Sequence, residues 1–123
     1  MCPHGSVWGR RAGAPPTTGP RRYPARQTRE TSRAVARLHR LDPERTVFAR
    51  QSAAAIDAGV FHHDVAGAGN ADVLLVHTHA FADRARTQDG IERKFAGCAG
   101  RDLTRIEISP DRLSLAEAVK TYF

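Results

Sequence analysis

Short apolar segments with strand character alternate along this chain with longer segments of helical periodicity. Their order predicts helix, strand, hairpin, helix, strand and helix, and such alternation is typical of the α/β class. The 123 residues suffice for one small domain with one modest core. We therefore expect one α/β unit with too few strands to complete a sheet by itself. The predicted segments are a helix from Thr28 to Leu41, strands at Thr46–Ala49, Val60–Val65, Val73–Val76 and Leu103–Ile108, a broken helix at Phe81–Phe95 and a last helix from Leu113.

Several helix ends carry recognisable signals. Thr28 is placed as an N-terminal capping residue, and the Asp42-Pro43 pair stops the helix that follows. Ser114 and Glu117 have the spacing of a capping box at the start of the last helix. Gly97 to Gly100 is expected to end the broken helix, which places Cys98 in a glycine-rich turn.

The two middle strands are predicted to form a hairpin. Val60–Val65 and Val73–Val76 are separated by the small residues Ala66 to Ala71, which are typical of a connection. Side chains two residues apart on a strand share a face, so His62 and Asp64 would point one way and His63 the other. A neutral imidazole exchanges a proton near pH 7, and a carboxylate binds a cation such as a guanidinium. The pair of His62 and Asp64 would suit a positively charged substrate.

Other interpretations of these histidines remain open. His77 and His79 also share a predicted strand face and could bind zinc together with His62 or His63, although their spacing matches no common zinc site. A partly buried histidine with satisfied hydrogen bonds is the structural alternative. Spacing alone does not choose between a catalytic site, a metal-binding module and an ordinary strand.

Charge is distributed unevenly. Residues 1–50 carry a net charge of +8 and residues 51–123 a net charge of −2, with 17 arginines and only two lysines overall. Several arginines at helical spacing suggest an alternative function, a small basic module that binds nucleic acid. No stacking aromatic residues lie between these arginines, so a solvated helix face is the simpler interpretation. These arginines are Arg29, Arg33, Arg37 and Arg40.

The first 20 residues differ in composition from the rest. They hold four of the seven prolines and four of the ten glycines, so we expect a disordered tail and a folded unit from residue 21 to 123. No apolar run approaches the roughly 20 residues of a membrane span. Cys2 and Cys98 form no disulfide framework, which favours the cytoplasm.

Longer stretches resemble a known family. RYPARQTRE, IDAGVFH followed by a variable residue and DV, and EISPDRLSLAEAVKTY occur in the order and at the separation found in bacterial N-succinylarginine dihydrolases. The resemblance extends from about Arg22 to Tyr122. It implies the five-bladed β/α propeller of the pentein, or guanidino-group-modifying, enzymes, of which this chain would form about one blade, a partial propeller.

The resemblance also implies roles for individual residues. His62 matches the catalytic histidine, and Arg26 and Asp64 match substrate-binding positions; the family usually has Asn where this chain has His63. In the implied reaction a cysteine thiolate attacks the guanidino carbon of N2-succinylarginine, and two rounds of hydrolysis give N2-succinylornithine, two ammonia and carbon dioxide, with His62 as the proton shuttle.

The resemblance finally sets expectations for the chain alone. The family's catalytic glutamate lies upstream of the matched segment and its nucleophilic cysteine lies near the C-terminus, so we expect no turnover, with Cys98 a bystander thiol. We expect a small-molecule substrate, no cofactor, no metal and no nucleic-acid or membrane partner. The full-length family member is expected to be a homodimer.

Overall fold

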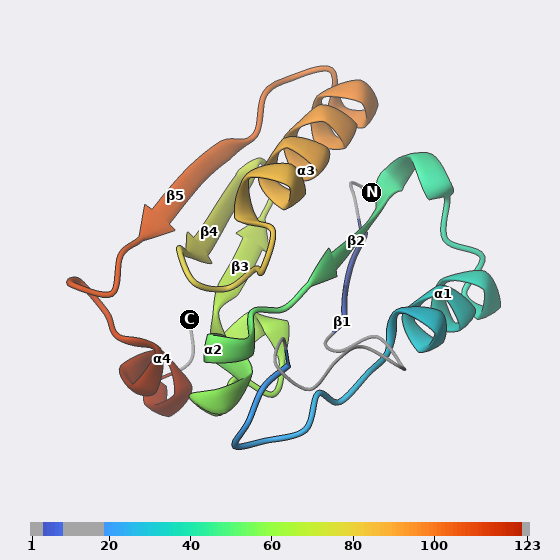
Figure 1. Cartoon of the computed structure of the whole chain (residues 1–123). Coiled ribbons are helices and arrows are strands. Elements are labelled where there is room, and N and C mark those ends of the chain that lie inside the picture. Colours follow the sequence, from blue (N-terminus) through green and yellow to red (C-terminus); the bar gives the residue numbers. More distant parts are fainter. Residues whose placement is uncertain (1–3, 9–18, 122–123) are drawn as a thin grey trace.

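The computed structural model describes residues 4–8 and 19–121, which form helices and short strands (Figure 1). The helices are α1 (Arg29–Leu38), α2 (Ala53–Asp57), α3 (Arg84–Ala99) and α4 (Leu115–Thr121), and the strands are β1 (His4–Trp8), β2 (Thr46–Arg50), β3 (Gly67–Asn70), β4 (Val73–His77) and β5 (Thr104–Ile108). Single 3-10 turns lie at Pro43–Arg45 and His63–Val65. The predicted α/β class is confirmed.

The strands form two small sheets. β1 and β2 pair in parallel, with His4 opposite Thr46. The second sheet has the order β3-β4-β5, in which β3 and β4 are antiparallel and β4 and β5 are parallel. A parallel pair requires a crossover connection, and α3 is that crossover. β5 therefore lies at the edge of its sheet (Figure 1).

The hairpin lies later in the chain than the sequence predicted, so the strand prediction for Val60–Val65 was wrong. The amides of Val65 and Ala66 bond to the carbonyls of His62 and His63, which closes a 3-10 turn instead. The small residues predicted as a connection form β3, which pairs with β4. Gly67 allows this because a Cβ there would lie 3.1 Å from the His63 ring and 3.3 Å from the Leu75 carbonyl oxygen. In this segment, the pairing of the β3 and β4 backbones therefore decides where the strand lies, and the strand propensity of the side chains does not.

α1 begins where the sequence predicted and ends three residues early. The Thr28 side chain accepts a hydrogen bond from the Thr31 amide at 3.2 Å, as an N-cap does. The helix buries Ser32 and Ala36, whereas Val35 and Leu38 are 40% and 79% exposed. The predicted apolar face is therefore largely uncovered, and the face with small side chains is buried.

α3 begins later and ends later than predicted. Two backbone hydrogen bonds attach the segment before α3 to residues 50–52. The amide of Ser52 donates to the carbonyl of Ala80, and the amide of Ala82 donates to the carbonyl of Arg50, both at 2.9 Å. The helix continues through Gly97 to Ala99, and Gly100 caps it with φ at 66°. Cys98 consequently lies in the last helical turn, which corrects its predicted place in a loop.

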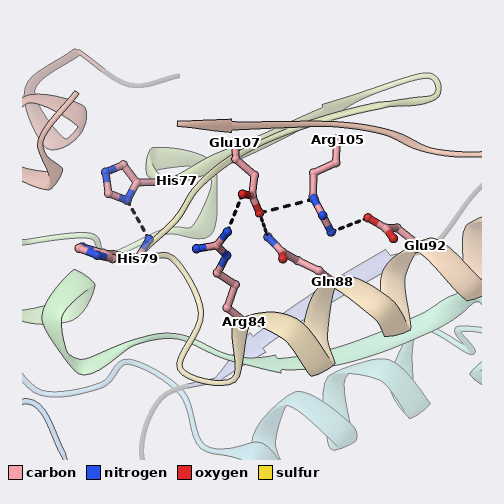
Figure 2. A network of polar contacts seen from close by, with 7 residues as sticks. All are labelled: His77, His79, Arg84, Gln88, Glu92, Arg105 and Glu107. Carbon is pink, nitrogen blue, oxygen red and sulfur yellow. Dashed lines mark hydrogen bonds and ion pairs between the residues drawn. The ribbon is translucent and has the colours of Figure 1, made fainter. Parts of the chain in front are cut away.

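Polar contacts join α3 to β5 (Figure 2). The Glu107 carboxylate accepts hydrogen bonds from Arg84 at 2.5 Å and Gln88 at 2.8 Å, and Arg105 donates to Glu92 at 2.6 Å. Desolvation raises the pKa of Glu107, but the hydrogen bonds from Gln88 and Arg84 and the positive charges of Arg84 and Arg105 outweigh it and leave that pKa lowered. An ionised Glu107 therefore fixes the helix to the edge strand.

The core is small and contains much alanine. It lies where β2, α2, the 3-10 turn after α2 and β4 meet, with Leu74, Ile91, Leu115 and Val119 packed around it. Its buried members are Ala49, Ala55, Val60, Val65, Ala66, Val76, Ala80 and Phe81.

The structure describes only part of the predicted disordered tail. Within residues 1–20, the structure describes the strand His4–Trp8 and residues 19 and 20. Residues 1–3 and 9–18, including Cys2, lie outside the described residues, and so do Tyr122 and Phe123.

Candidate functional site

A cavity of about 440 Å³ opens between the segment before α1, the loop after α2, and α4. Arg26 comes from the first segment and His62 from the second, while Phe61, Val65 and Val119 provide apolar walls. The site thus places two polar side chains beside apolar surface, as ligand sites commonly do.

Arg26 and His62 are in direct contact although they lie 36 residues apart in the chain. A guanidinium nitrogen of Arg26 lies 2.8 Å from Nε2 of His62 and 3.3 Å from its Nδ1. A guanidinium only donates hydrogen bonds, so the nearer ring nitrogen accepts through its lone pair in this contact. The structure therefore brings together two of the three site residues predicted from the sequence.

The segment that carries Arg26 is held in place by contacts that the sequence patterns did not predict. The Asp57 carboxylate, at the end of α2, accepts hydrogen bonds from the backbone amides of Arg21, Arg22 and Tyr23. The Tyr23 ring meets the Phe61 ring edge-on at 5.4 Å between centroids. The only sequence signal for Asp57 was its place at the start of the IDAGVFH block.

Asp64 is placed differently from the sequence expectation. It lies in the 3-10 turn, is exposed, and does not line the cavity that His62 lines. Because there is no strand here, the argument that His62 and Asp64 share one strand face fails. The substrate-binding role of Asp64 remains a prediction that rests on the family resemblance.

His63 is mostly buried beside this turn. Its ring stacks on Phe81 at 4.9 Å between centroids, and its Nδ1 has no hydrogen-bond partner among the described residues. Desolvation lowers the pKa of His63, and the nearby Asp64 carboxylate opposes this effect in part. His63 is therefore a neutral packing residue under ordinary conditions.

His77 has a structural role that leaves no nitrogen for a metal. It is 1% exposed, its Nε2 donates to the Leu113 carbonyl at 2.9 Å, and its Nδ1 accepts from the His79 amide at 3.0 Å (Figure 2). The predicted zinc alternative that used His77 therefore fails. Within the described ranges, no three histidine, cysteine or acidic side chains form a group able to hold a metal.

Three of the four arginines proposed for nucleic-acid binding lie at four-residue spacing on α1. Arg29, Arg33 and Arg37 are exposed there, whereas Arg40 lies beyond the helix end with φ at 52°. The basic-module alternative stays a prediction.

A family model described as succinylarginine dihydrolase matches residues 5–123. The chain belongs to the succinylarginine dihydrolase family. The match begins at residue 5, upstream of Arg22, where the resemblance was expected to begin. Within the part of the chain that the structure describes, no helix is long and apolar enough to cross a membrane.

Curated members of this family are similar over most of the chain. The N-succinylarginine dihydrolases of Yersinia pestis (strain Pestoides F) and Yersinia pseudotuberculosis (serotype O:1b, strain IP 31758) are each 52% identical to it over 103 residues, or 84% of its length. The matched region is 23% of each relative. The chain thus spans about a quarter of the length of the succinylarginine dihydrolases it matches.

Proposed function

We propose that this chain is a segment of an N-succinylarginine dihydrolase that provides the proton-transferring histidine, His62, and an anion-binding arginine, Arg26. The observation that carries the proposal is the 2.8 Å contact between these side chains at a cavity in a chain of this family. The segment would form about one blade of a propeller whose other parts complete the site.

The chemistry of N2-succinylarginine matches the two groups. The substrate has carboxylates on its succinyl part and on its α-carbon, and the planar guanidinium of Arg26 can bind a carboxylate through two parallel hydrogen bonds. The imidazole of His62 can accept a proton as the nucleophile is activated and return it to the departing ammonia.

Asp64 would bind the substrate's guanidinium in the complete site. It is exposed on the 3-10 turn in the present arrangement, so this role requires that the turn or the substrate bring the carboxylate to the cavity mouth. For the metal-binding alternative, the described residues contain no group of three ligands able to hold a metal.

Catalysis requires a nucleophile and a glutamate that the family resemblance places beyond this segment. We therefore propose that the chain alone binds the substrate weakly and does not hydrolyse it, and that the complete enzyme works in the cytoplasm without a cofactor, as a homodimer.

A binding experiment tests the proposal. Titration of the chain with N2-succinylarginine, followed by NMR, should shift the ring signals of His62, and Arg26→Ala should weaken that binding at least tenfold. Arg33→Ala, which removes an exposed arginine of α1, is the matched control and should bind as the unaltered chain does. Equal affinity in the Arg26→Ala and Arg33→Ala variants would contradict the proposal.

An ammonia assay with the same substrate should show no turnover. Turnover that Cys98→Ala abolishes would show instead that Cys98 is the nucleophile.

A further inference from the structure

One carboxylate in this chain binds three consecutive backbone amides from a distant segment. Oδ1 of Asp57 lies 2.6 Å from the Arg22 amide nitrogen and 3.2 Å from that of Tyr23, and Oδ2 lies 2.9 Å from that of Arg21. The partners are 34 to 36 residues away in sequence. Three donors on one carboxylate fix both the position and the orientation of the segment.

Asp57 is also close in sequence to the other half of the site. It ends α2, and Gly59, with φ at 100°, turns the chain toward His62. Arg26 follows Tyr23 by three residues, a stretch of chain that spans at most about 10 Å. Asp57 therefore links the segment that carries the guanidinium to the loop that carries the imidazole.

We propose that Asp57 is a positioning residue that holds the Arg26 guanidinium against the His62 imidazole. The significance for catalysis rests on the proposed function, but the positioning itself does not. The contact of Tyr23 with Phe61 adds an apolar attachment to the same segment and does not replace the three hydrogen bonds.

Electrostatics support this arrangement. The segment that Asp57 binds carries Arg21, Arg22 and Arg26, so the carboxylate also offsets local positive charge. The amide bonds from Arg21 and Arg22 lower the pKa of Asp57, so its carboxylate stays ionised as an acceptor to a lower pH than an ordinary aspartate does.

Two NMR measurements on the full 123-residue chain test the proposal. Amide exchange of Arg21, Arg22 and Tyr23 should be at least tenfold faster in Asp57→Ala than in the unaltered chain. The ring nitrogen signals of His62 should move to the positions they have in Arg26→Ala. Asp57→Asn keeps one carbonyl acceptor and should give intermediate values, and Asp89→Ala, at an exposed site on α3, should change neither measurement.

Two results would overturn the proposal. One is exchange of these three amides in the unaltered chain at the rate of an unstructured peptide. The other is unchanged His62 signals in an Asp57→Ala or Asp57→Asn variant whose three amides have lost protection. If amide protection in α3 is also lost in Asp57→Ala, that variant has unfolded more widely. The Asp57→Asn variant then provides the deciding measurement.

Failure of the proposed function would look different. His62 and Arg26 would remain coupled to Asp57, while N2-succinylarginine would leave the His62 signals of the unaltered chain unmoved.

Discussion

At the scale of single residues, the imidazole of His63 couples protonation to folding. Burial against Phe81 lowers the pKa of His63, so the unfolded chain binds a proton there more tightly than the folded chain does. Where the unfolded state binds more protons, stability rises with pH. The contribution of the neutral ring is therefore complete above its ordinary pKa of 6.5 and is lost as the pH falls below that value.

We accordingly expect the free energy of unfolding to fall between pH 7.5 and pH 5. His63→Asn, which cannot take up a proton, should show a smaller fall over this range. Urea unfolding curves at a series of pH values measure both slopes. His79→Asn is the control, because His79 is exposed and should leave the slope unchanged. Identical slopes for His63→Asn and the unaltered chain would contradict the assignment.

Individual site residues differed in how far the sequence could predict them. Arg26 and His62 were found because each lies in a long block that resembles one family, and the structure joins them. The geometric argument for His62 and Asp64 failed because a two-residue repeat has meaning only on a strand, and this segment turns. Asp57 was missed because its partners are backbone amides, which leave no mark in the sequence.

At the scale of elements, the capping residues at helix ends were the sequence features that predicted the structure best. The Ser114 and Glu117 capping box is confirmed, since the Ser114 amide donates to Glu117 Oε2 at 2.9 Å and the Glu117 amide to Ser114 Oγ at 3.2 Å. The bond from the Ser114 hydroxyl also lowers the pKa of Glu117. The positions of the strands were harder to predict, because β3 consists of small residues that form a strand only through pairing with β4.

The capping box should matter for the site because α4 carries Val119, an apolar wall of the cavity. Ser114→Ala should lower the free energy of unfolding by about 1 kcal/mol, the usual cost of losing an N-cap. Chemical denaturation measures this loss, with the exposed Ala116→Ser as a control on the same helix. No loss in Ser114→Ala would show that the helix start is held by other contacts.

At the scale of the whole molecule, apolar surface remains uncovered. Leu38 on α1 is 79% exposed and Ile106 on β5 is 48% exposed, and β5 has one unpaired edge within the described sheet. Exposed apolar side chains and open strand edges favour association. A chain that spans 23% of its relatives has surfaces of the kind that the remaining parts of such a protein would cover.

We therefore expect the chain to associate as its concentration rises. Sedimentation velocity should show this, and the double substitution Leu38→Lys with Ile106→Lys should reduce it. Arg33→Lys, which keeps the charge on exposed α1, should not. A sedimentation coefficient that does not change with concentration in the unaltered chain would argue against exposed association surfaces.

The contact between Arg26 and His62 has a consequence for which molecules can react. In the proposed site, the lone pair that would receive a proton is engaged by the guanidinium. A compound would therefore become reactive only once its own negative group had drawn Arg26 away. A guanidine without such an anionic tail would meet an occupied base. Discrimination against these compounds would then arise at proton transfer as well as at docking.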